Sequence, residues 1–249
     1  MFKLSRRLKK IGSAAVAGLL ALGQAQAADN PNFVEPCART DSFPSPAVNG
    51  PFDYRTGGAR LKMVESNHFA PQIENLVRGR TGTLAQEFSF LLHGFPNHHR
   101  GLAAISNYAL REHKPQPGNL DYSVECYFLR AMRFQPDDHV VRMLFADYLW
   151  KINRTADAVQ YLDQVQKAPV SENPITAYNL GLLYLEMGRF DQALIQAHKA
   201  DELGNPRTGL RDALQAKGKW VAPPAANSST PAKVDPAASM PAAAASGPS

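Results

Sequence analysis

Cysteine is scarce in this sequence, and its two cysteines do not have the spacing of a metal site. The 249 residues contain only Cys37 and Cys126. Structural zinc sites usually draw on cysteines two to four positions apart. In an oxidising compartment one pair allows one disulfide, which would tie the N-terminal part of the chain to a helix. The alternative is two unrelated thiols, with Cys126 a small buried hydrophobe.

Catalytic signature motifs are also missing. The sequence has no G-x-S-x-G, H-E-x-x-H, C-x-x-C, Walker or G-x-G-x-x-G motif. It therefore predicts a protein that is not an enzyme and carries no cofactor. The alternative is a catalytic group whose residues are brought together only by the fold and so form no sequence motif.

An excess of charge of either sign is missing once the start of the chain is set aside. Residues 1–10 hold five basic and no acidic residues, residues 11–22 are apolar or small, and residues 25–27 read Ala-Gln-Ala. This order is typical of a secretory signal peptide, and the apolar run is too short to span a bilayer as a helix. An uncleaved anchor is the alternative. We expect a periplasmic, or else secreted, protein without a stable membrane anchor.

Removing residues 1–27 changes the charge balance. Of the 27 basic and 22 acidic residues, 22 of each remain. Nucleic-acid binding requires a basic surface that displaces counterions, so we expect no nucleic-acid partner.

Residues 28–67 predict an irregular N-terminal arm. They contain many prolines and glycines and no helical period. Phe33, Phe43, Phe52 and Tyr54 are too many aromatics for a disordered linker. We expect the arm to lay these rings over a helical domain, with residues 50–54 as a docking turn, rather than to form a ligand cage.

Residues 174–207 have the spacing of one helix–turn–helix unit of about 34 residues. Leu180-Gly181 and Tyr184 mark the inner face of a first helix, and Gly188 marks its end. Small residues then recur at four and three positions on a second helix, namely Ala193, Ala197 and Ala200.

The same spacing extends to both sides of this unit. Residues 139–173 read as a second unit, with Asn153 in the turn, and residues 97–136 as an earlier one with an inserted turn, in which Leu102-Ala103 replaces Leu-Gly. A further helix pair is suggested by residues 73–92. Residues 208–220 predict a capping helix. The expected helical domain thus covers residues 68–220, followed by a disordered Ala/Pro/Ser-rich tail at 221–249.

Residues 139–207 resemble the tetratricopeptide repeat family, with Leu180-Gly181, Tyr184, Ala193 and Pro206 matching its pattern. Several shorter segments, 50–54, 96–100, 125–128 and 209–220, look like those of a group of exported bacterial repeat proteins. The resemblance implies an all-α fold: a right-handed α-solenoid of about three to four hairpins whose concave groove binds a peptide or partner protein of the cell envelope.

Groove residues follow from the expected register of the first helices. Arg100 with neighbouring Asn side chains could hold a carboxylate or a peptide backbone, and Trp150 and Tyr178 could supply aromatic anchors. Solvated polar residues and packing aromatics are the alternative. The full expected set is Asn97, Arg100, Asn107 and Tyr108 from the first unit, Asp147, Trp150 and Lys151 from the second, and Tyr178, Asn179, Leu182 and Glu186 from the third.

His98-His99 suggests a different function, an exported metal- or small-molecule-binding protein that uses these residues and the arm. Adjacent helical residues point about 100° apart, so the pair cannot chelate a metal from one helix face. We therefore expect His98 to cap or pack at a helix start and expect no metal site. A third hypothesis is self-association by end-to-end stacking, which a capping helix would oppose. The sequence does not specify an oligomeric state.

Overall fold

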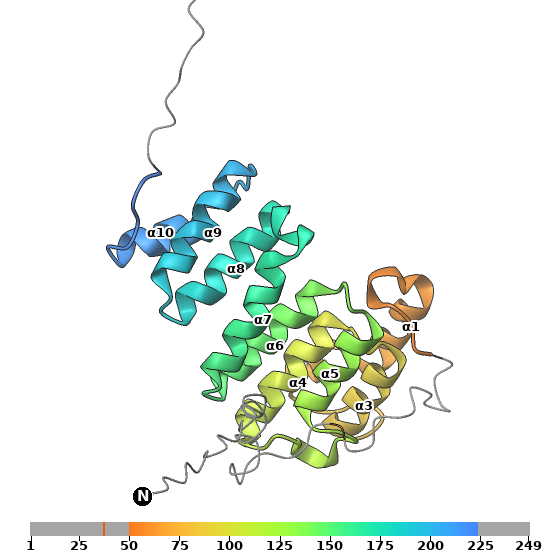
Figure 1. Cartoon of the computed structure of the whole chain (residues 1–249). Helices are drawn as coiled ribbons and strands as arrows, with labels where there is room; N and C mark the ends of the chain where they lie inside the picture. Colours follow the sequence, from red (N-terminus) through yellow and green to blue (C-terminus); the bar gives the residue numbers. More distant parts are fainter. Residues whose placement is uncertain (1–36, 38–49, 224–249) are drawn as a thin grey trace, which may run out of the picture. The chain divides into compact units, whose positions relative to one another are not determined.

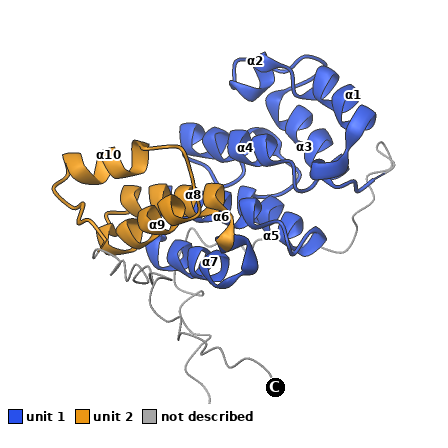
Figure 2. Ribbon diagram, turned by 90° about the horizontal axis from the view of Figure 1, so that it is seen from above, with its two compact units in different colours: residues 1–171 blue, residues 172–249 orange. Residues whose placement is uncertain are grey.

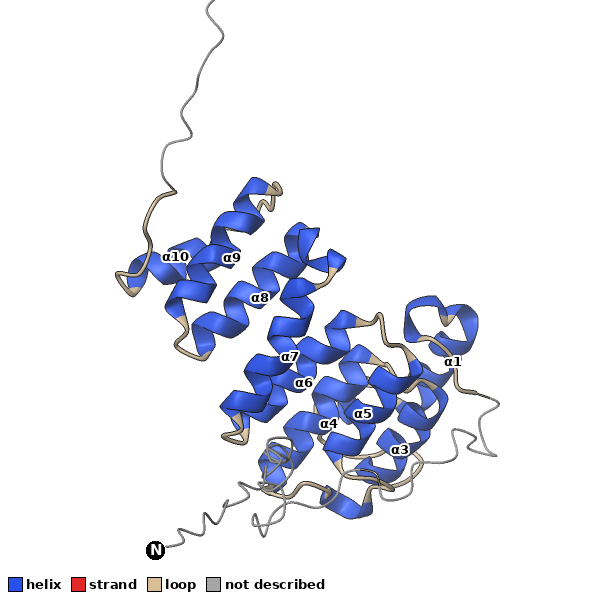
Figure 3. Cartoon of the chain, viewed as in Figure 1, coloured by secondary structure: helices blue, strands red, loops and turns tan. Residues whose placement is uncertain are grey.

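A computed structural model describes Cys37 and residues 50–223, and every regular element in these residues is helical (Figures 1 and 3). The all-α prediction is therefore confirmed. The expected signal peptide, most of the arm (residues 28–36 and 38–49) and the tail from residue 224 lie outside the described residues. None of the described helices is long and apolar enough to cross a membrane.

The chain forms two compact units that divide after Ser171 (Figure 2). The α-helices of the first unit are α1 (Gly58–His68), α2 (Pro71–Glu74), α3 (Leu84–Gly94), α4 (His99–Glu112), α5 (Val124–Phe134), α6 (His139–Lys151) and α7 (Thr155–Lys167). Those of the second unit are α8 (Pro174–Glu186), α9 (Phe190–Glu202) and α10 (Gly209–Ala216). Short 3₁₀ helices cover Tyr54–Thr56, Pro117–Asn119 and Pro169–Glu172.

The hairpin of α8 and α9 forms where the repeat pattern predicts it. Asn173 caps α8 by accepting hydrogen bonds from two backbone amides of its first turn. Gly188 takes a left-handed conformation, φ +72°, in the turn. The small residues of α9 are buried against α8, and α10 packs on both helices. Gly181 allows this packing, because a Cβ there would lie 2.2 Å from Leu210 Cδ2.

The hairpin of α6 and α7 repeats this arrangement. Asn153 turns the chain with φ +64°, and Ala158, Leu162 and Val165 bury the inner face of α7. Helix α6 also packs on α4 and α5, so the hairpin contacts the preceding helices of the first unit.

The register expected for α4 is wrong by one turn. The helix begins at His99, with His98 as its N-cap. Ala103, the expected counterpart of the close-packing glycine, is only partly buried. Ser106 is buried instead and bonds back to the Leu102 carbonyl at 2.8 Å. An apolar–small pair occurs twice in this helix, and only the second, Ile105-Ser106, has both side chains buried.

The arm ends earlier than expected, because residues 58–67 belong to α1. This helix packs on α3. Val64 is its only fully buried side chain, so its apolar periodicity is too weak to be seen in the sequence.

The disulfide between Cys37 and Cys126 is present, with their Cα atoms 4.9 Å apart. Cys126 lies buried in α5. The bridge fixes Cys37 of the arm to the first unit.

Candidate functional site

The docking turn expected at residues 50–54 lies against the end of α3 and the loop that follows it. The Phe52 amide donates to the Gly94 carbonyl at 2.8 Å, and the Phe52 ring lies 5.7 Å from that of Phe95. Arg55 forms ion pairs with Asp53 at 2.8 Å and with Asp137 at 2.9 Å. The hydrogen bond from Arg55 lowers the pKa of Asp53 to about 2.

Asn97 is buried beneath this turn and is not a surface residue, so its expected place in a groove is wrong. Its side-chain oxygen accepts from the Tyr54 amide at 2.9 Å. Its side-chain nitrogen donates to Asp53 and Asp138, each at 2.8 Å. The amide group thus joins the arm to the N-cap residue of α6 and has no free group for a partner.

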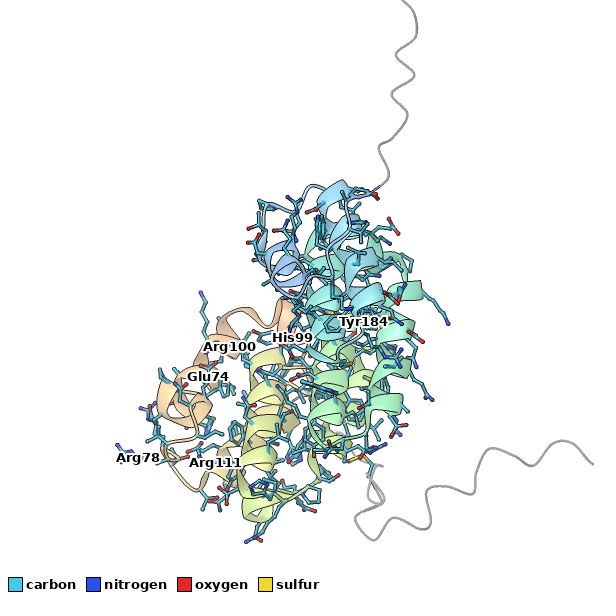
Figure 4. The ribbon with its side chains drawn as sticks, turned by 90° about the vertical axis from the view of Figure 1, so that its left-hand side faces the viewer. Glu74, Arg78, His99, Arg100, Arg111 and Tyr184 are labelled. Carbon is cyan, nitrogen blue, oxygen red and sulfur yellow. A yellow bond between two sulfur atoms is a disulfide. The ribbon has the colours of Figure 1, made fainter. Side chains whose placement is uncertain are left out.

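Arg100 holds a carboxylate, but one that belongs to this chain. Its Nε donates to Glu74 Oε1 at 2.8 Å, and Nη2 contacts the second oxygen of the same carboxylate. Nη1 lies 3.3 Å from Glu65. Figure 4 shows Arg100 and Glu74 facing each other. The forked recognition expected for a ligand therefore fastens α2 to α4.

The other two residues expected on α4 differ in exposure. Asn107 is exposed. Tyr108 is buried, with its ring 6.2 Å from that of Phe88 and the Arg111 guanidinium 5.2 Å above it. Only Asn107 of the four residues expected from this repeat remains both accessible and free of an ion pair in the structure.

The residues expected from α6 do reach the surface. Lys151 donates to Asp147 at 2.6 Å, which is a helical i,i+4 pair. Trp150 is partly exposed next to them. We call this face, together with Val140, the α6 surface.

The residues expected from α8 lie on one side of that helix in the second unit. Tyr178, Asn179 and Leu182 are partly exposed, and Glu186 is exposed. The Arg207 guanidinium lies 5.7 Å from the centre of the Tyr178 ring. We call this face, together with Ile175, the α8 surface, and it is described separately because it belongs to a different unit.

His98 is a capping and packing residue, as expected. Its Nδ1 accepts from the Gly101 amide at 2.9 Å, so Nε2 carries the proton and faces Glu65 at 3.1 Å. The rings of Tyr54 and Phe69 lie 4.3 and 4.9 Å away. Burial lowers the pKa of His98 to about 3.

His99 is directed away from His98 and toward Asp138. Its Nε2 lies 2.9 Å from both carboxylate oxygens of Asp138. Burial raises the pKa of Asp138, but the hydrogen bonds from His99 and Asn97 outweigh this effect, and the pKa is lowered. Over residues 50–223 and Cys37, no three His, Cys, Asp or Glu side chains are grouped so as to hold a metal ion.

Sequence reasoning missed two features of these surfaces. Val140 and Ile175 are both exposed, although each is a large apolar residue on a first helix. The sequence spacing could have identified them, because the two positions are 35 residues apart, the same offset that relates Ala146 to Gly181. Comparison with known proteins does not assign a family: no family model matches the chain, and no curated protein matches it.

Proposed function

We propose that this protein is an exported, non-catalytic scaffold that binds a peptide or partner protein of the cell envelope through the α6 and α8 surfaces. In this proposal α4–α5, α6–α7 and α8–α9 are tetratricopeptide-like hairpins of a right-handed α-solenoid, and α10 is its cap. The shared register of α6–α7 and α8–α9 supports this arrangement, since the left-handed turn residues Asn153 and Gly188 are also 35 residues apart.

One observation carries the proposal: the two first helices leave equivalent positions open to solvent. Val140 is 39% exposed and Ile175 is 50% exposed. Lys151 and Glu186, which are also equivalent, are exposed as well. A single exposed apolar residue needs no explanation. A large apolar residue at the same place in two repeats, beside polar side chains, has the composition of a protein-binding surface.

The remaining side chains of the two surfaces fit this use. Trp150 and Tyr178 supply partly exposed aromatic rings, which dominate binding energy when a partner buries them. Asn179 supplies an amide that can both donate and accept a hydrogen bond with a peptide backbone.

Crosslinking in native cells tests the proposal, with Ile175→Asp compared with Ile195→Asp. Ile195 is 57% exposed and lies on the second helix, α9, so it provides the same substitution outside the proposed surface. A buried charge at a binding surface is costly, and we expect Ile175→Asp to reduce the attached partner by tenfold or more. Val140→Asp should act in the same direction, and Ile195→Asp should retain the partner.

Equal recovery of the partner by Ile175→Asp, Val140→Asp and the Ile195→Asp control would show that the first helices are not the binding surface. Melting temperatures of the purified variants separate a lost contact from a lost fold. Asp at position 175 is compatible with folding, because it lies in the first turn of α8, where a negative charge is favourable.

A further inference from the structure

The acidic side chains between residues 58 and 98 all bond within the first unit. Glu65 lies 3.1 Å from His98 and 3.3 Å from Arg100. Glu74 forms the ion pair with Arg100 described above. Glu87 is fully buried, lies 2.7 Å from His68 and accepts from the backbone amides of residues 80 and 81. No acid in this segment is left facing solvent without a partner.

The basic side chains of the same segment are arranged in the opposite way. Arg60, Lys62, Arg78 and Arg80 are all exposed, and the ion pairs found among the described residues involve none of them. Arg60 lies 4.1 Å from the centre of the Phe52 ring, and Arg80 contacts the Ser66 carbonyl. Among the described residues, four cations therefore have no acidic partner, although residues 28–249 contain equal numbers of basic and acidic residues.

Helix geometry places Lys62 on the outward side of α1. At about 100° per residue, Lys62 lies about 160° from the buried Val64, with Met63 on one side of it and Glu65, which is paired with Arg100, on the other. Met63 is 60% exposed, whereas Val64 on the inner side is buried. The outward side of α1 thus carries Lys62 beside the exposed apolar side chain of Met63, and Arg60 is exposed nearer to the arm.

The loop after α2 adds to this side. Contact of Arg80 with Ser66, one turn beyond Met63, places the loop against α1. Two residues upstream, Arg78 reaches away from the helices in Figure 4. Its neighbour Val77 is 70% exposed. We call the set Arg60, Lys62, Met63, Val77, Arg78 and Arg80 the α1 face, and α1 and α2 lie at the edge of the first unit in Figure 2.

We propose that the α1 face binds the surface of a membrane that contains anionic phospholipids. Clustered cations are attracted by the negative potential of such a surface, and exposed apolar side chains beside them enter the headgroup region. Within residues 50–223, Lys62 and Arg78 make no hydrogen bond or ion pair that fixes their position, which suits a diffuse surface better than a shaped partner. The association is peripheral, and the inference does not depend on the proposed function.

Cosedimentation with lipid vesicles tests the inference on protein expressed from the complete coding sequence. Vesicles of phosphatidylcholine are compared with vesicles that also contain phosphatidylglycerol. The test variant is Lys62→Gln with Arg78→Gln. The control is Arg133→Gln with Lys167→Gln, which removes one exposed arginine from α5 and one exposed lysine from α7. The test variant and the control have the same N-terminal sequence.

We expect binding to the anionic vesicles only, weakening as salt is added. The test variant should have a roughly 30-fold lower partition coefficient, which is the factor for two charges, and the control should keep most of its binding. Equal losses in the two variants, or no loss in the test variant, would overturn the proposal. Binding to polyglutamate provides the other check. If wild type binds polyglutamate but not the vesicles, and the Lys62→Gln, Arg78→Gln variant loses this binding, the face would bind an acidic protein instead of a membrane.

Discussion

His98 joins three parts of the first unit through one side chain. Its ring lies between Tyr54 of the arm and Phe69 after α1, while its two nitrogens cap α4 and face Glu65. The capping bond needs an unprotonated Nδ1, so protonation of His98 would break it. Burial and the cap together favour the neutral ring.

The neutral state of His98 predicts a loss of stability in mild acid. Its pKa is about 3 in the folded protein and 6.5 when unperturbed, so between these values the unfolded chain binds a proton that the folded protein does not. Lowering the pH from 7 to 5 should therefore reduce the free energy of unfolding by about 2 kcal/mol through this residue. Chemical denaturation at both pH values measures the change.

His98→Asn is the matched variant for this measurement, because Asn also accepts a hydrogen bond at an N-cap but does not titrate. The variant should lose about 2 kcal/mol less than wild type over the same pH range. If His98→Asn and wild type lose the same free energy of unfolding between pH 7 and pH 5, His98 does not control this response.

The sequence located the residues near the start of α4 but not their partners. Asn97 and Arg100 have the chemistry expected of ligand-binding groups, and both do hold carboxylates. Those carboxylates belong to Asp53 and Glu74, 44 and 26 residues away in the chain. Local spacing cannot reveal that a distant segment of the same protein occupies a binding group.

At the scale of elements, Gly181 determines how closely α10 approaches α8. Replacing it by Val would place a branched side chain where Leu210 Cδ2 and Gln196 Cβ already lie. We expect Gly181→Val to reduce the free energy of unfolding by about 2–3 kcal/mol through overpacking. Adding Leu210→Ala should recover part of this loss, because the two changes share one contact. Strictly additive effects in urea unfolding would contradict this assignment.

Prediction of the elements succeeded where turn residues mark the boundaries. Gly188 and Asn153 end α8 and α6 near the expected positions, because left-handed turns accept few residue types. Prediction failed for α1, which has one fully buried side chain, and for the register of α4, where two apolar–small pairs compete. In both cases packing against other helices decides what the local pattern leaves open.

At the scale of the whole molecule, the balance of charge over residues 28–249 conceals a local separation of charge. Residues 28–249 contain 22 basic and 22 acidic residues and suggest no charged surface. The structure pairs Glu65 and Glu74 with Arg100 and leaves Lys62 and Arg78 exposed. Only the fold reveals this difference, because it depends on the partners that each acid finds.

The disulfide should make a large contribution to stability. Its cysteines are 89 residues apart, and in the chain-entropy model closing a loop of this length stabilises by about 4–5 kcal/mol. Cys37→Ser with Cys126→Ala should lower the free energy of unfolding by up to this amount, measured in guanidinium. Wild type with a reducing agent is the control for the altered side chains, and equal stability with and without reductant would contradict the prediction.

The same bridge makes a covalent ring of the chain from Cys37 to Cys126, and the ring contains α1 to α4 and the start of α5. A single peptide-bond cleavage within that ring would leave one connected molecule. On a non-reducing gel such a nicked protein would run as one band, and two fragments would separate only after the sulfurs are reduced.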